Sequence, residues 1–100
     1  MFLDTQNLTA RDFQHEIGQV FTAETVPEPV ELTLLNVTQG PASRNEFRPP
    51  FTLHFTSQIN VLLLEAQYSL KSASGRQYMI YLSPLAPQGS TLRHYQAHFN

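Results

Sequence analysis

The chain has 100 residues, the usual length of one domain, and its 41% hydrophobic content is too high for a disordered protein. The absence of cysteine excludes disulfide frameworks and thiolate metal sites. Six basic and eight acidic residues give a net charge of -2 without any block of like charge, which disfavours nucleic-acid binding. We therefore expect one domain, residues 1–100, that is stabilised by side-chain packing alone.

No segment of the sequence is predicted to enter a membrane. The first residues, Met1–Asp4, reach an acidic side chain at once, unlike a signal peptide. The apolar run Val61–Leu64 is far shorter than the roughly 20 residues that cross a bilayer. We expect a soluble protein that has no membrane partner.

A short helix is predicted near the start of the sequence. Thr9 is a favourable N-cap, Asp12 adds negative charge to the first turn, and Gly18 supplies a left-handed stop. Phe13 and Ile17 lie four residues apart and give this helix of about nine residues a narrow apolar face. Because an isolated helix of this length is marginal in water, we expect both side chains to dock against the rest of the domain.

From residue 19 onward the hydrophobic period changes to two, and β-branched and aromatic residues become frequent, which indicates β-strands. The predicted strands cover Val20–Glu24, a segment from Val30 to Val37, Phe51–Thr56, Tyr68–Leu70, Arg76–Leu82 and Leu92–Phe99. A β-bulge near Leu34 and Leu35 reconciles a change of parity in the second strand. Ser72–Gly75 is predicted to be the turn of a hairpin. Loops are expected at Gln39–Pro50 and around residues 84–89.

Six strands joined by turns rich in Gly and Pro predict a mainly β fold. We expect a small antiparallel six-stranded barrel or sandwich with one short N-terminal helix that covers one end. Tyr68, Tyr78 and Tyr95 have the parity of core residues, whereas His94 and His98 lie on the polar face of the last strand.

No residue is predicted to be catalytic, to bind a cofactor or to bind a metal. His94 and His98 share a strand face, but at ~3.3 Å per residue they lie about 13 Å apart, too far for one zinc ion. His15 and His54 are predicted on solvated faces. The sequence contains no G-x-S-x-G, no phosphate-binding glycine loop and no H-E-x-x-H motif, so we expect no enzyme activity.

One pair of residues is the candidate interface. In the predicted strand Arg76–Leu82 both faces are apolar, with Tyr78 and Ile80 on one side and Met79 and Tyr81 on the other. Tyrosine is frequent in interfaces, and the low charge of this domain does little to discourage association. Met79 and Tyr81 are therefore the predicted contact residues for another protein or a second copy of the chain.

Several segments carry a family resemblance: Leu8-Thr9-x-x-Asp12-Phe13, Gly18-Gln19-Val20-Phe21, Pro50 to Phe55, Tyr68-Ser69-Leu70, Leu82-Ser83-Pro84 and Tyr95 to Asn100. In this order they resemble a small bacterial domain family of unknown function along the whole of its 100 residues. The resemblance implies a bacterial source and a genomic setting beside tail-collar-type proteins of phage-like particles, and it brings no catalytic residue. The chain departs from the family pattern at Ala66, where relatives often have Gly, which leaves the turn before Tyr68 open.

These features predict a non-catalytic interaction or structural module, which the resemblance places in a phage-tail-like assembly. It would associate with a protein partner or with itself, through strand edges or through the Met79 and Tyr81 face. The alternative is a small-ligand-binding β-barrel, because many aromatic residues point inward and the loop at residues 39–50 could cover its mouth. The expected compartment is the cytoplasm, or an extracellular phage-like particle that needs no signal peptide.

Overall fold

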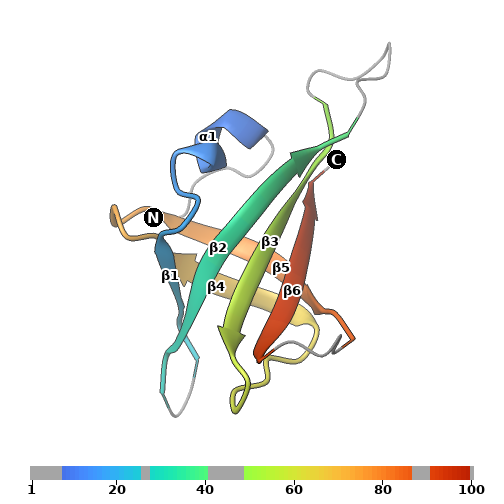
Figure 1. The fold of residues 1–100 in the computed structure, drawn as a ribbon. Coiled ribbons are helices and arrows are strands. Elements are labelled where there is room, and N and C mark those ends of the chain that lie inside the picture. Colours follow the sequence, from blue (N-terminus) through green and yellow to red (C-terminus); the bar gives the residue numbers. More distant parts are fainter. Residues whose placement is uncertain (1–7, 26–27, 41–48, 87–90, 100) are drawn as a thin grey trace.

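The computed structural model describes residues 8–25, 28–40, 49–86 and 91–99, and this part of the chain has one short helix and six strands. The elements are α1 (Ala10–Gln14), β1 (Val20–Ala23), β2 (Val30–Gln39), β3 (Phe51–Gln58), β4 (Ala66–Lys71), β5 (Gln77–Pro84) and β6 (Leu92–Phe99). All six predicted strands are confirmed, with small differences at their ends (Figure 1). The sequence did not define the turn before Tyr68; in the structure this connection ends where β4 begins, at Ala66.

The strands form a closed antiparallel barrel in the order β1-β2-β3-β6-β5-β4. Figure 1 shows β4 and β5 running across behind β2, β3 and β6. Of the two predicted architectures, barrel and sandwich, the barrel is therefore the observed one. Each strand pairs with a neighbour on both sides, although the β1–β4 and β5–β6 contacts span only two residue pairs each, so association through strand edges stays a prediction.

The ladders around the barrel differ in length. β3 and β6 pair along their full length, from Phe51↔Phe99 to Gln58↔Leu92. By contrast, β5 and β6 pair only at Ser83↔Gln96 and Pro84↔Tyr95, and β1 and β4 pair only at Thr22↔Lys71 and Ala23↔Leu70. We call these two short contacts, β5–β6 and β1–β4, the seams of the barrel.

The interior of the barrel is filled with side chains from α1 and from all six strands. The largest fully buried ones are Tyr78, Tyr95, Phe13, Phe21, Phe51, Phe55, Leu32, Leu34, Leu53, Leu70, Ile80 and Leu82. Alternation along the strands places all of these residues except Phe13 of α1 inward, because successive side chains of a strand point to opposite faces. The predicted core positions of Tyr78 and Tyr95 are confirmed, and Tyr68 is half-buried against the same cluster.

The helix α1 closes the end of the barrel where β3 begins and β6 ends (Figure 1). The ring of Phe13 lies against three aromatic rings, with centroid distances of 5.1 Å to Tyr78, 5.8 Å to Phe99 and 5.9 Å to Phe51. At the start of the helix, the N–H of Thr9 donates to the Asp12 carboxylate at 2.7 Å, as expected for the predicted N-terminus.

The helix is shorter than predicted, and the prediction that Ile17 docks against the domain is wrong. α1 ends at Gln14, and the side chain of Ile17 is 42% exposed. The reason is the early return of the chain to the sheet: the N–H of Gly18 donates to the carbonyl of Leu34 at 2.7 Å, and the N–H of Leu34 donates to Gln19 at 3.1 Å. These bonds stop the helix before a second turn could bring Ile17 onto the face of Phe13.

The predicted bulge in β2 is confirmed. The register with β3 shifts between Leu34 and Asn36, so that Leu34 pairs with Phe55 and Val37 with Leu53. Leu35 is the extra residue and points outward, half-exposed, whereas Val37 packs against the core. One inserted residue therefore keeps the inner face of a long strand apolar on both sides of the bulge.

The predicted hairpin turn agrees with the structure, whereas Pro84, predicted to lie in a loop, is the last residue of β5 and pairs with Tyr95. Gly75 has φ +93° in the hairpin between β4 and β5, a left-handed conformation that favours glycine. Most of the predicted loop Gln39–Pro50 lies outside the described residues, and so do Pro87 and Gly89 of the loop after β5. The strand β1 ends at Ala23, one residue before the predicted end at Glu24.

Candidate interaction surface

The loop between β3 and β4, residues 59–65, carries the most exposed apolar side chains in the described part of the chain. Leu62 is 52% exposed and Leu64 is 69% exposed, whereas Leu63 between them is buried in the core. Leu63 therefore holds the loop to the barrel, at the end opposite α1 (Figure 1), while its two neighbours are exposed to solvent.

The hydroxyl of Tyr95 fixes this loop from inside the barrel. It accepts the N–H of Leu63 at 3.1 Å and lies 3.1 Å from the hydroxyl of Ser57 and 3.4 Å from the carbonyl of Val61. Since a buried backbone N–H without a partner is costly, this contact favours one loop conformation. The apolar side chains are thus presented by an ordered loop.

Two more apolar side chains extend this surface. Ile59 begins the loop, and Leu92 starts β6 directly opposite Gln58; both side chains are exposed. Arg93 donates from Nε to the carbonyl of Ile59 at 2.8 Å, which holds the loop against β6. We call the four exposed side chains the apolar rim: Ile59, Leu62, Leu64 and Leu92.

The predicted contact residues Met79 and Tyr81 lie on the outer face of β5, next to the apolar rim. Tyr81 is 52% exposed and Met79 is half-buried. The Tyr81 hydroxyl donates to the carboxylate of Glu65, the last residue of the loop, at 2.5 Å. This hydrogen bond to a negative group raises the pKa of Tyr81 above its ordinary value and orients the ring toward the loop.

The apolar rim was not predicted from the sequence. A signal was present, since Val61–Leu64 is an apolar run without the period of two that marks the strands around it. Runs of this kind in a loop cannot bury every side chain, because the chain has no regular alternation to turn them inward. Only the fold shows that Leu63 takes the inward position.

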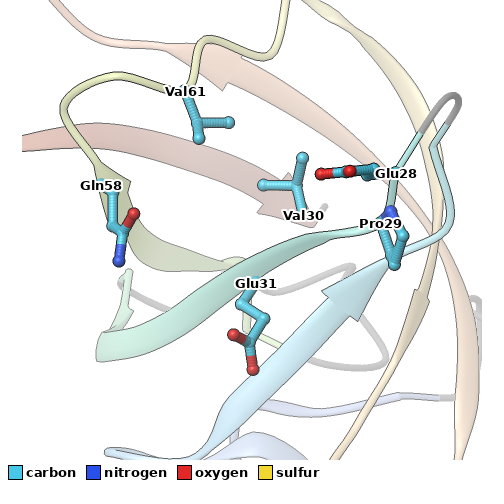
Figure 2. A pocket seen from close by; sticks show the side chains of 6 residues that line it. All are labelled: Glu28, Pro29, Val30, Glu31, Gln58 and Val61. Carbon is cyan, nitrogen blue, oxygen red and sulfur yellow. The ribbon is translucent and has the colours of Figure 1, made fainter.

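A shallow pocket of about 230 Å³ adjoins the loop on the side of β2. Its lining residues are Glu28, Pro29, Val30, Glu31, Gln58 and Val61. Figure 2 shows the side chains of Val30 and Val61 facing one another, while the Glu31 carboxylate points away from them. The border of the apolar rim is therefore acidic on this side.

A second pocket of about 270 Å³ lies at the opposite end of the barrel, where Gly40, Pro50 and Phe51 meet His98 and Phe99. Both pockets lie at the ends of the barrel, and the core residues occupy the space along its axis. The packing of the described residues therefore gives no support to the small-ligand-binding alternative.

On the outer face of β3 and β6 the structure brings together two histidines that the sequence analysis treated separately. Nε2 of His54 lies 2.9 Å from Nδ1 of His94, and both side chains are half-buried. Burial, and the proximity of His94, lower the pKa of His54 below its ordinary value. His98 is apart from this pair, with Nδ1 at 2.8 Å from the hydroxyl of Thr52.

The architecture is that of a small closed six-stranded antiparallel β-barrel with a filled core, one helical lid and an apolar rim at the opposite end. A family model described as "Domain of unknown function (DUF6916)" matches residues 8–99. The chain belongs to this family, which confirms the resemblance to a small domain family of unknown function. No curated protein and no solved structure matches the chain. Within the described residues, no helix has the length and apolar character needed to span a membrane.

Proposed function

We propose that this chain is a non-catalytic interaction module that associates with a second copy of itself through the apolar rim and the adjoining Tyr81 face. The observation that carries the proposal is the exposure of Leu62 and Leu64 on an ordered loop. Single exposed apolar residues are common on protein surfaces, but a cluster on one fixed loop is typical of binding sites.

The charges around the rim favour a protein partner over a lipid surface. Glu65, Glu28 and Glu31 border the rim, and Arg93 is the cation beside Ile59. Carboxylates are repelled by anionic lipid headgroups, which attract clusters of basic residues instead. In a dimer the same carboxylates repel their counterparts, so we expect weak association that strengthens when salt screens the charges.

The association is tested by sedimentation equilibrium of the purified chain at increasing concentration, up to about millimolar. We expect reversible dimers in the unmodified chain. Leu64→Asp should weaken the dimer by at least about tenfold, because it places a desolvated charge in the contact. Tyr81→Asp should weaken it as well, since Tyr81 borders the rim.

The matched control is Leu35→Asp, which introduces the same charge at a half-exposed leucine on the outer face of β2. This variant should dimerise like the unmodified chain. A chain that stays monomeric at the highest concentration contradicts self-association, and equal weakening by Leu35→Asp and Leu64→Asp contradicts the assignment of the rim.

The finer proposal, that the module belongs to a phage-tail-like assembly, is supported by the family resemblance alone. The identity of neighbouring genes tests it. Genes for tail-collar-type proteins beside this one in several genomes would support a role in particle assembly, and their absence would leave self-association without that setting.

A further inference from the structure

We infer that His54 and His94 form a two-histidine binding site for a divalent transition-metal ion on the outer face of β3 and β6. The pair lies on the outer wall of the barrel, where His94 is two residues along the same face of β6 from Leu92 of the apolar rim. The inference departs from the sequence-based expectation of no metal site, which compared only residues within one strand.

The register of the two strands builds the pair. His54 lies directly opposite Gln96 and His94 directly opposite Thr56, so the two histidines are diagonal neighbours on one face. These strands pair along their full length, which gives both imidazoles a rigid support. The ring centroids lie 5.0 Å apart and the rings meet edge to face.

The distance between the two nitrogens suits a shared ion. Imidazole nitrogens bind metal at about 2.0–2.1 Å, so two of them on a tetrahedral zinc ion lie about 3.3 Å apart. In a square arrangement, typical of Cu²⁺ and Ni²⁺, neighbouring nitrogens are about 2.9 Å apart. The observed 2.9 Å between Nε2 of His54 and Nδ1 of His94 matches the second value and is close to the first.

Binding requires a change of tautomer and a tilt of the rings, because the two nitrogens point at each other in the hydrogen bond and must instead converge on one ion. In the hydrogen-bonded pair, one ring donates its proton to the other, and that proton must leave the space between them before an ion can enter. The donor ring then carries its proton on its other nitrogen, so both facing lone pairs become ligands without a net loss of protons.

The remaining positions on the ion would be filled by water or by neutral side chains. Within the part of the chain that the structure describes, no third histidine or acidic residue joins the pair. Gln96 lies opposite His54 on β6 and carries an amide oxygen on the same face, whereas the amide oxygen of Asn36, opposite His54 on β2, already accepts the N–H of Val37 at 2.9 Å. Nitrogen ligands with few oxygens favour Cu²⁺, Ni²⁺ and Zn²⁺ over Mg²⁺ and Ca²⁺.

The test is isothermal titration calorimetry of the chain, without an affinity tag, against Ni²⁺ and Zn²⁺. We expect saturable binding of one ion per chain. His54→Gln and His94→Gln should each weaken binding by at least about tenfold, because each removes one of two protein ligands. His98→Gln and His15→Gln are the matched controls and should leave the affinity unchanged within about twofold.

A second measurement does not depend on the folding of any variant. Paramagnetic Ni²⁺ added to the unmodified chain should broaden the NMR signals of His54, His94 and their strand neighbours before those of His15 and His98. Broadening centred elsewhere overturns the assignment. So does the lack of a one-to-one site, or an equal loss of affinity in the control variants.

Discussion

Two buried tyrosines differ in the hydrogen bonds of their hydroxyl groups, and this difference should affect the stability of the fold. Tyr78 and Tyr95 are both fully buried and both point into the barrel. The hydroxyl of Tyr95 accepts the N–H of Leu63 and contacts Ser57, whereas within the described residues the buried hydroxyl of Tyr78 lies near the Arg76 guanidinium but makes no hydrogen bond of standard geometry. Burial raises the pKa of Tyr78, as expected for a phenol in an apolar environment.

This difference predicts opposite results for the same substitution. Tyr95→Phe should lower the free energy of unfolding by about 1–3 kcal/mol, because it leaves the buried N–H of Leu63 without a partner. Tyr78→Phe should be neutral or raise it by up to about 1 kcal/mol, since it removes a buried polar atom that makes no hydrogen bond of standard geometry in the described part of the chain. Urea unfolding followed by circular dichroism measures both, and equal losses would contradict this reading of the core.

The sequence predicts the inward direction of both tyrosines from the period of two, and this is confirmed. It cannot predict which hydroxyl finds a partner, because the partner of Tyr95 lies 32 residues away, on a loop. The same limit applies to His54 and His94, which are 40 residues apart and meet only through the register of β3 and β6.

At the scale of elements, the helix depends on one side chain. α1 has five residues, and an isolated helix of this length is unstable in water. Phe13 is fully buried among Phe51, Tyr78 and Phe99, so its packing supplies most of what holds α1 to the barrel.

Phe13→Ala should therefore lower the free energy of unfolding by about 3–5 kcal/mol, the usual loss for a buried aromatic side chain. Ile17→Ala is the matched control in the same segment and should change it by less than about 1 kcal/mol, because Ile17 is largely in water. Thermal and urea unfolding give both values. Similar losses at the two positions would show that α1 continues beyond Gln14 in solution.

The strands were predictable element by element, and the helix less so. The alternation of Phe51, Leu53 and Phe55 with polar residues is visible within the strand itself. Whether a residue of β3 points inward or outward can therefore be predicted from its position in the alternation. The length of α1 is set instead by bonds between Gly18 or Gln19 and Leu34 of another strand. Tertiary contacts of this kind are absent from helix propensity, which explains the overestimate.

At the scale of the molecule, the barrel is held together unevenly. Its seams depend on few hydrogen bonds, among them Glu24 N–H to Ser69 and Leu85 N–H to His94, both 2.9 Å long. The ladder between β3 and β6 spans eight residues of each strand and lies over the buried Phe55 and Leu53.

Native-state hydrogen exchange should reveal this difference. The amide protons of Glu24 and Leu85 should exchange at least about tenfold faster than those of Phe55 and Leu53, because the seams can open without breaking the central ladder. NMR after transfer into D₂O measures the rates. Equal protection at all four amides would mean that the barrel opens only as one cooperative unit.

Closure itself was not readable from the sequence. The period of two places side chains inside or outside, but it contains no information on which strands meet, and the order β1-β2-β3-β6-β5-β4 departs from the order of the chain. The barrel and the sandwich were therefore equally compatible with the pattern.

The position of β6 has a consequence for synthesis of the protein. Of the six described strands β6 is synthesised last, and it lies between β3 and β5, so the five earlier strands cannot close the barrel before it is present. Until β6 pairs, the apolar faces of β3 and β5 are exposed in the nascent chain. Chaperones or rapid folding are then needed to avoid misassembly. The barrel therefore stays open during synthesis, and pairing of the eight-residue strand β6 closes it.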